Sequence, residues 1–464
     1  MRSISALKLK KPATASLWYI GTNIFSRVSS FIFTPIFTRI LSPGEYSLYF
    51  LYSGWLGIVS VLSTLDLSGS VTFRALSENV VSGEDFFRGA IVMQGGLSIL
   101  SLLVFFIFSG RIISFTSLPL SLFIIMFIQI FLNFSEGLYF AKKRYSYDYK
   151  KISAVNIISG IASPIIAIAF ILFTPYKSEG RIFGVGVVSL LISLPLIFSM
   201  LKGEKSFVGR GVYRYIFKLA IPLLPFAIFN SVSANCDKII VSRILGRGAL
   251  GEYSLGHSMG FAMNFLTLGV SLAMTPWVMR KLRSGEEKIT RDTLKYTVFL
   301  ICGVVLLYLC ALPEVISILA PQSYRGGMSV VYPLSAGVVF SFLAGILTSA
   351  LLERKRGGWL VFSSFIGAAF AVGVGILLAL RFGYFGCAVG IMLSFAVRFL
   401  ALYLAGGKEL LDMKSITFST LYLSLFAFLS YALRFSFTAR VLLGGAIILT
   451  LIPSAMRARS LLVE

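Results

Sequence analysis

The sequence is short of charge and of the residues that most enzymes use at their active sites. Only 13% of its 464 residues are charged, roughly half the share found in soluble domains, and there is a single histidine. One histidine leaves little room for a Ser/His/Asp triad, and the four cysteines lack the CxxC or Cys/His spacing of a metal site. No loop is long enough to fold as a soluble domain. These absences argue against an enzyme, and against a glycan polymerase in particular, and predict neither a cofactor nor a metal.

The chain is rich in long runs of apolar residues. Of its residues 57% are apolar, and a helix needs about 20 of them to cross the hydrocarbon core of a bilayer. Candidate spans are centred near residues 28, 56, 98, 124, 163, 191, 231, 264, 304, 339, 369, 393, 424 and 446. The sequence therefore predicts an all-α integral membrane protein with about 14 transmembrane helices, of which those near 28 and 231 are the most polar.

The basic residues are distributed unevenly between alternate loops. With the N-terminus placed inside, 29 of the 42 Lys and Arg residues fall on the inner side and 10 on the outer side. Three lie inside spans, namely Arg27, Lys238 and Arg398. This is the positive-inside pattern, so we expect a multi-pass protein of the cytoplasmic (inner) membrane with both termini in the cytoplasm. The net charge of +23 then reflects topology, and no nucleic-acid partner is expected.

One phrase occurs twice. "RILSPGEYSLY" runs from Arg39 to Tyr49, and "RILGRGALGEYSLG" runs from Arg243 to Gly256. Each copy lies where an odd-numbered span ends and the next begins, and six spans separate the two copies. An even number of crossings puts both copies on the same side, as in a parallel repeat. We expect an N-lobe at residues 1–201 (spans 1–6), a C-lobe at 202–407 (spans 7–12) and additional spans 13–14 at 408–464.

The two spans that carry the repeated phrase also carry polar residues at three- and four-residue steps. Such residues share one helical face, and that face cannot lie against lipid. The candidates for lining a cavity are Asn23 and Ser30 in the first span and Asn230 and Asn235 in the seventh.

The three basic residues inside spans are candidates for contact with an anionic substrate. A charge near the middle of a membrane is costly unless it is paired or hydrated. Arg27, Arg398 and Lys238 could form a cationic cavity wall, and arginine in particular can form paired hydrogen bonds with a diphosphate. The alternative is structural: Lys238 neutralises Asp237, and Arg398 reaches the membrane surface.

Three acids lie close to span interiors, namely Asp66, Glu136 and Asp237. Burial favours the neutral form of a carboxyl, so such a group could bind and release a coupling ion during transport. Alternatively, each caps a helix or pairs with a cation. The lone His257, near the outer end of the eighth span, could also titrate, although a single histidine at the interface is more commonly inert.

Five segments, in this order, resemble the polysaccharide-exporter flippases (Wzx type) of the MOP superfamily. They are "PIFTRILSPGEYSLYFLY" (35–52), "DLSGSVTFRAL" (66–76), "NCDKIIVSRILGRGALGEYSLG" (235–256), "LAPQSYRGGMSVVYPLSAG" (319–337) and "RFGYFGCAVG" (381–390). Family members often have arginine after the central aspartate, where this chain has Lys238, which keeps the charge but loses the planar fork.

The resemblance implies two six-helix lobes similar to those of MATE antiporters. It implies a transporter that moves an undecaprenyl-diphosphate-linked oligosaccharide from the inner to the outer leaflet by alternating access, coupled to H⁺ or Na⁺, for O-antigen or another surface polysaccharide. A glycan polymerase and chain-length proteins are then expected partners, beside membrane lipid. Two alternatives remain open: a MATE-like cation or drug antiporter, which needs an acidic cavity, and a lipid II flippase.

Overall fold

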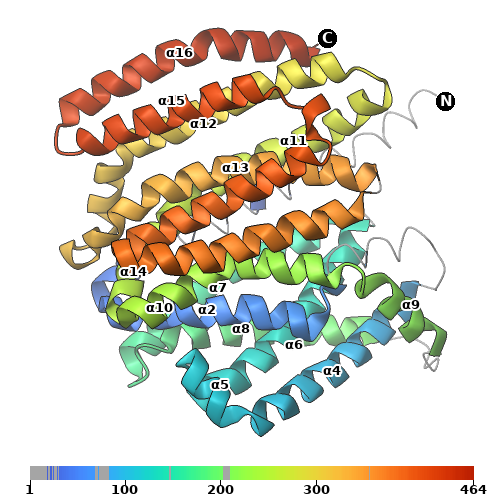
Figure 1. The fold of residues 1–464 in the computed structure, drawn as a ribbon. Helices are drawn as coiled ribbons and strands as arrows, with labels where there is room; N and C mark the ends of the chain where they lie inside the picture. Colours follow the sequence, from blue (N-terminus) through green and yellow to red (C-terminus); the bar gives the residue numbers. More distant parts are fainter. Residues whose placement is uncertain are drawn as a thin grey trace. The chain divides into compact units, whose positions relative to one another are not determined.

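The computed structural model describes residues 31–67, 83–145, 148–201, 210–354 and 356–463, with the single residues 18, 21, 22, 25, 29 and 72. Within these ranges the chain is helical, with turns and no strand (Figure 1), which confirms the predicted all-α class. The first half holds α2 (Pro43–Thr64), α4 (Gly83–Ile107), α5 (Ser109–Thr116), α6 (Leu120–Tyr145), α7 (Tyr149–Phe173), α8 (Gly180–Leu201) and α9 (Arg210–Ala220). The second half holds α10 (Leu224–Gly260), α11 (Asn264–Arg283), α12 (Glu287–Leu319), α13 (Met328–Glu353), α14 (Gly357–Leu404), α15 (Met413–Ala432) and α16 (Phe437–Val463), with short 3₁₀ turns at Phe261–Met263, Gln322–Gly327 and Gly407–Glu409.

Ten helices in the described ranges are long and apolar enough to cross a membrane. One of them, α14, has 48 residues but is broken at Gly383 (φ 62°, ψ −148°), and its two arms contain the spans predicted near 369 and 393. Two helical segments, Gly211–Ala220 and Leu224–Ser271, are joined at a bend of 52° and would count as an eleventh span if taken together. They include the positions 231 and 264, near which two spans were predicted. The predicted first span is represented by a shorter apolar helix, Phe31–Ile40.

The first copy of the repeated phrase begins α2 with a well-formed cap. Ser42 accepts a hydrogen bond from the backbone of Glu45, whose carboxylate in turn accepts from the backbone of Ser42. Pro43 follows in the first turn, where its missing N–H costs nothing. The helix ends at Leu65, which adopts a left-handed conformation.

The chain divides into two compact units, Met1–Ser231 and Val232–Glu464. The division falls inside α10, so α2 to α9 belong to unit 1 and α11 to α16 to unit 2. The predicted lobe boundaries at 201 and 407 stay predictions.

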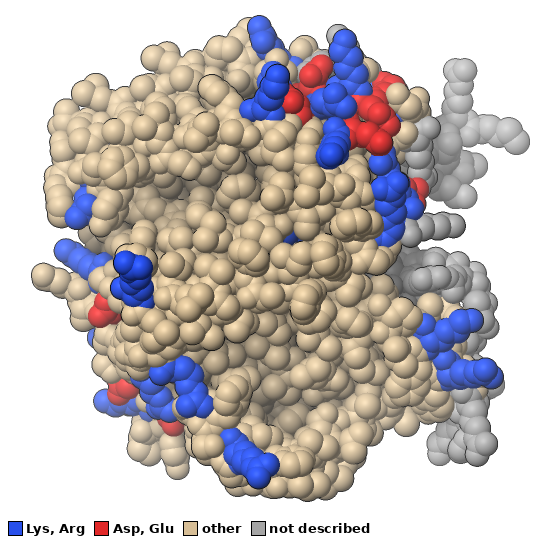
Figure 2. Space-filling model, viewed as in Figure 1, with Lys and Arg blue, Asp and Glu red and all other residues tan. Residues whose placement is uncertain are grey.

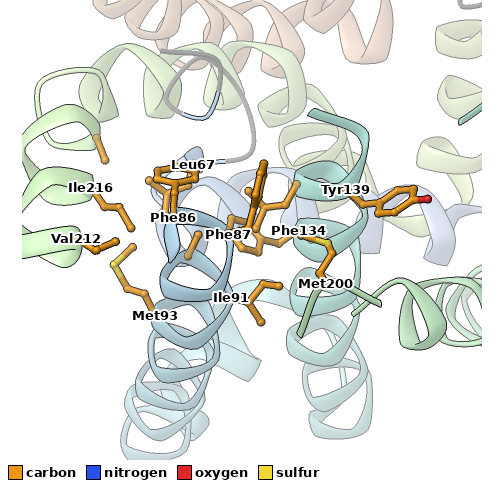
Figure 3. Close-up of a cluster of buried hydrophobic side chains, with 13 residues drawn as sticks. Leu67, Phe86, Phe87, Ile91, Met93, Phe134, Tyr139, Met200, Val212 and Ile216 are labelled. Atoms are coloured by element: carbon orange, nitrogen blue, oxygen red, sulfur yellow. The ribbon is translucent and has the colours of Figure 1, made fainter. Parts of the chain in front are cut away.

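A buried core at one end of unit 1 explains the position of α9 (Figure 3). Val212, Ile216 and Ala220 lie along one face of α9 and are buried. They pack with Phe86 of α4 and Phe134 of α6, among other apolar side chains. The opposite face carries Arg214 and Lys218, both exposed. This pattern is typical of a helix that lies at a membrane surface rather than across it.

The outer surface of the spans is apolar. Large apolar side chains such as Ile107 (74% exposed), Phe173 (84%) and Leu442 (71%) are mostly exposed. In water a surface of this kind would aggregate, whereas lipid solvates it. The protein is therefore a multi-pass membrane protein.

Candidate functional site

A break in α10 brings residues from two predicted spans together. Gly246 has φ 88° and ψ 175°, a conformation that residues with a Cβ rarely adopt. In a straight helix, residues 237 and 253 would be about 24 Å apart. Instead, the hydroxyl of Tyr253 donates to Oδ2 of Asp237 over 2.7 Å, so the two arms of α10 fold back on each other.

Asp237 is the centre of a buried polar cluster. Its side chain is 1% exposed, and Nε2 of His257 lies 3.2 Å from the same Oδ2 that Tyr253 contacts. Its other oxygen, Oδ1, is buried without a hydrogen-bond partner among the described residues. From α14, Sγ of Cys387 donates a weak hydrogen bond to the backbone oxygen of Asp237 over 3.9 Å.

Charged and titratable groups surround Asp237. A buried carboxylate is costly unless its charge and all its lone pairs are satisfied. Lys238, the next residue, acts on its charge electrostatically, and His257 contacts Oδ2, while Oδ1 has no hydrogen-bond partner among the described residues. A carboxylate in this setting is a candidate for binding a proton or another cation.

Lys238 follows Asp237 but does not pair with it. Its Nζ donates to Oδ1 of Asn235 over 3.0 Å, and no ion pair joins it to Asp237 in the described part of the chain. Both Lys238 and Asn235 were predicted as substrate-binding residues, and the structure brings them together. Tyr253 and His257 contact the carboxylate of Asp237 directly, and Lys238 acts on its charge electrostatically, so the neutralisation of Asp237 by Lys238 stays an open alternative.

The remaining predicted residues of unit 2 and of α10 lie apart from this cluster. The aliphatic stem of Arg398, in the second arm of α14, lies beside Gly367 of the first arm. A Cβ added to Gly367 would lie 3.4 Å from the Cβ of Arg398. Asn230 is half-buried in the part of α10 that belongs to unit 1. The next residue, Ser231, donates to the backbone oxygen of Gly57 over 2.6 Å and so fixes α10 to α2.

The two predicted acids of unit 1 occupy separate places. Asp66 comes directly after α2, has φ 51°, and burial raises the pKa of its carboxyl. Glu136 is half-buried in α6 and faces Ser193 of α8. Three further predicted residues, Asn23, Arg27 and Ser30, lie outside the described residues. No group of three or more His, Cys, Asp and Glu side chains in the described ranges is arranged to hold a metal.

Unit 1 has a charged cluster of its own that sequence reasoning missed. The guanidinium of Arg181, at the start of α8, lies 4.1 Å from the ring centre of Tyr49, 5.0 Å from Phe37, 5.2 Å from Tyr46 and 5.6 Å from Phe50. Contacts of this kind hold a cation over the negative face of aromatic rings. Its Nη1 is buried without a hydrogen-bond partner in the described ranges. The signal was in the sequence, since Tyr46, Tyr49 and Phe50 share a helical face.

Tyr253 was also missed, and His257 was judged to be inert more often than not. They stand four residues apart, so they share one face of the second arm of α10. Tyr253 lies in the second copy of the repeated phrase and His257 directly follows it, but the acid that they contact lies in the preceding arm.

Comparison with known proteins agrees with this architecture. A family model described as "Polysaccharide biosynthesis protein" matches residues 14–260, which is more than half of the chain. The "Probable low-salt glycan biosynthesis flippase Agl15" of Haloferax volcanii is 21% identical over 398 residues, covering 83% of this chain and 81% of that protein.

Two solved structures show the same fold. One is "Lipid II flippase MurJ, inward closed conformation", with a TM-score of 0.74 and 15% identity, covering 96% of this chain and 99% of the other. The second is the inward-facing conformation of a multidrug resistance MATE family transporter of the MOP superfamily, with a TM-score of 0.65 and 12% identity, covering 84% and 95%. These findings confirm the resemblance to MOP-superfamily polysaccharide flippases, and the chain belongs to the polysaccharide biosynthesis protein family.

Proposed function

We propose that the protein is a flippase that carries an undecaprenyl-diphosphate-linked oligosaccharide from the inner to the outer leaflet of the cytoplasmic membrane, for O-antigen or a similar surface polysaccharide. Membership of the polysaccharide biosynthesis family supports the glycan part of this proposal. The glycan flippase of Haloferax volcanii and the lipid II flippase fold support the lipid-linked part. The observation that carries the proposal is that buried polar and cationic side chains lie inside apolar helices, with Lys238 beside Asn235 in α10 and Arg398 in α14.

The substrate has three parts with different needs. Its polyprenyl tail can remain in lipid throughout, whereas the sugar needs hydrogen bonds and the diphosphate needs positive charge. Arg398 and, in the first span, Arg27 offer guanidinium groups that can form paired hydrogen bonds with phosphate oxygens. Lys238 adds a compact charge that Asn235 holds in place. Binding followed by alternating access would then expose the headgroup to either side of the membrane.

We further propose that transport is coupled to protons through Asp237. Its burial, its unpaired Oδ1 and its contact with His257 support a site that takes up one proton at a time. Histidine is the side chain whose charge changes between pH 5 and pH 8, which suits a gradient across a cell membrane. Asp66 and Glu136 are the further candidates for ion coupling.

Flipping in liposomes tests the proposal. The purified protein would be reconstituted with a fluorescent undecaprenyl-diphosphate oligosaccharide, and the accessibility of the fluorophore to an external quencher followed with and without a pH gradient. Arg398→Ala is expected to lose most of the flipping, about 100-fold if paired hydrogen bonds to the diphosphate are lost, and Arg398→Lys to retain part of it.

Arg381→Ala is the matched control, because this exposed arginine stands at the turn of the same helix. Lipid II and a soluble organic cation would be assayed in parallel. Gradient-driven movement of the cation, without flipping of either lipid by well-folded protein, would overturn the proposal in favour of a drug antiporter. Flipping of lipid II alone would move it to cell-wall synthesis.

A further inference from the structure

A cavity at one end of unit 2 is separate from the residues proposed for transport. It has a volume of about 500 Å³ and lies between α12, α15 and α16. Its walls are formed by Lys295, Tyr296, Phe299, Asp412, Lys414, Ser415, Phe418, Ser419, Thr450 and Ser454. All three helices belong to unit 2, so the cavity is complete within that unit.

The cavity carries more positive than negative charge. Lys295 and Lys414 are exposed, and the ion pairs in the described part of the chain involve neither of them. Arg457 adds a third cation, since its Nη1 donates to the hydroxyl of the wall residue Tyr296 over 3.2 Å. Figure 2 shows Lys and Arg side chains, together with Asp and Glu side chains, at this end of unit 2, where α12 and α15 begin.

The one carboxylate in the wall is already engaged. Asp412 caps the N-terminus of α15, where it accepts hydrogen bonds from the backbone N–H groups of Lys414 and Ser415 and from the hydroxyl of Ser415 over 2.6 Å. Its carboxylate also lies close enough to Lys295 to interact with that charge, so it offsets one of the cations and leaves the others in excess. An anion that entered the cavity would face a net positive charge and the hydroxyls of Thr450 and Ser454.

The opposite wall is apolar and continues along the membrane. The ring of Phe299 lies 6.2 Å from that of Phe418, which is 63% exposed. From Phe418 an exposed apolar stripe follows α15 through Leu421, Leu425 and Phe428, at helical spacing. A molecule with an anionic head and an acyl chain could therefore place the head between the lysines and the chain along this stripe.

The depth of the cavity matches the headgroup region of a bilayer. The 20 residues of α15 are about 30 Å long, enough to span the hydrocarbon core, so Lys414 at its start lies at an interface. The 33 residues of α12 are about 50 Å long and extend beyond the core. Lys295 lies eight residues into α12, about 12 Å along it, which brings it to the level of Lys414.

We propose that this cavity binds the headgroup of an anionic phospholipid, such as phosphatidylglycerol, with Lys295, Lys414 and Arg457 on its phosphate and an acyl chain along Phe418. The bound lipid fills the space between α12, α15 and α16 and stabilises their packing. The lysines, the engaged Asp412 and the adjoining apolar stripe favour a lipid of the surrounding leaflet over a soluble phosphate. The inference does not depend on the identity of the transported substrate.

Lipid retention on the purified full-length protein tests this inference. Native mass spectrometry would count the phosphatidylglycerol molecules retained by the parent chain and by the double variant Lys295→Ala/Lys414→Ala. The control is Lys150→Ala/Lys151→Ala, which removes two exposed lysines from α7. A charge-preserving variant, Lys295→Arg/Lys414→Arg, shows whether substitution at these two positions by itself reduces lipid retention through misfolding.

We expect the double alanine variant to retain phosphatidylglycerol about tenfold more weakly, while the control and the arginine variant bind as the parent does. Phosphatidylcholine is expected to be retained poorly by all four proteins. Equal retention by the double alanine variant and the control would overturn the inference. Displacement of the lipid by millimolar inorganic phosphate would also overturn it, because it would identify a site for free phosphate. A double alanine variant that lost retention of undecaprenyl diphosphate but not of phosphatidylglycerol would overturn it too, because it would identify a substrate site.

Discussion

The tyrosines of the two Gly-Glu-Tyr-Ser copies contact groups of opposite charge, a cation in unit 1 and an anion in unit 2. In unit 1 the ring of Tyr46 lies 5.2 Å from the cation of Arg181. In unit 2 the corresponding Tyr253 donates its hydroxyl to the anion of Asp237 over 2.7 Å. Four residues further on, Phe50 completes the rings around Arg181, where the second copy has His257 next to Asp237.

The partner helices follow the same pattern. Arg181 stands between Gly180 and Gly184, and both glycines lie against α7 so closely that an added Cβ would collide with it. In unit 2 the same spacing recurs in Gly386 and Gly390, with Cys387 in the place of Arg181. A repeat can therefore preserve backbone packing while its charged group moves to another helix. Unit 1 has a cation among aromatic rings, whereas unit 2 has a buried carboxylate that we propose as the proton-binding group.

The largest effect is expected when the anion of unit 2 is removed. Asp237→Ala leaves the buried hydroxyl of Tyr253 without its acceptor and should destabilise the protein by about 3 kcal/mol, measured by thermal unfolding in detergent. Asp237→Asn keeps an acceptor of the same shape, so we expect it to fold and to flip substrate without a response to a pH gradient. A gradient response in Asp237→Asn equal to that of the parent would exclude this residue from coupling.

Removing the cation of unit 1 should affect stability rather than coupling. Arg181→Ala loses its contacts with four aromatic rings, and we expect a loss of about 1–2 kcal/mol in thermal unfolding. The pH dependence of flipping should be unchanged. The control is Lys177→Ala, an exposed cation close by in sequence, for which a change below about 0.5 kcal/mol is expected. A changed pH profile in Arg181→Ala would mean that both units take part in coupling.

Converting one copy into the other sharpens the comparison further. His257→Phe gives unit 2 the residue that unit 1 has at Phe50, while Tyr253 and Asp237 keep their hydrogen bond. We expect flipping to persist but to vary several-fold less between pH 5 and pH 8 than in the parent, because Asp237 loses the imidazole that contacts its Oδ2. The measurement is the flipping rate against symmetrical pH, and a profile that matches the parent would contradict the assignment.

The smallest effect concerns two carboxylates next to helix ends, Asp66 and Asp412, whose pKa values are shifted in opposite directions. Burial raises the pKa of Asp66 in unit 1, so the stability that its neutral form contributes is present below about pH 4 and is lost as pH rises through the raised pKa. The hydroxyl of Ser415 lowers the pKa of Asp412 in unit 2, so its contribution is present above about pH 4 and is lost on acidification.

Thermal unfolding of Asp66→Asn and Asp412→Asn from pH 3 to pH 7 checks both signs. Relative to the parent, Asp66→Asn should become more stable as the pH rises, and Asp412→Asn less stable. The same pH trend in both variants would show that the two environments do not differ as described.

Sequence reasoning predicted the helical class, the apolar spans and the repeat, because hydrophobic length and charge asymmetry depend on local composition. It could not predict that Tyr253 and His257 reach Asp237, because that contact depends on how two arms fold back at Gly246. It did not single out Arg181, which stands in the first turn of α8 with its guanidinium 4.1 Å from the ring centre of Tyr49. The role of Arg27 stays a prediction.

The close approach of the two arms of α14 also bears on how the protein is made. Its 48 residues leave the ribosome as one apolar stretch whose charges are Arg381, next to the turn at Gly383, and Arg398. A Cβ added to Gly390 would lie 2.6 Å from the Cα of Gly375, so backbone meets backbone without side chains between. Within this pair the stem of Arg398 packs beside Gly367, so the hairpin itself covers part of the one arginine that lies inside its second arm.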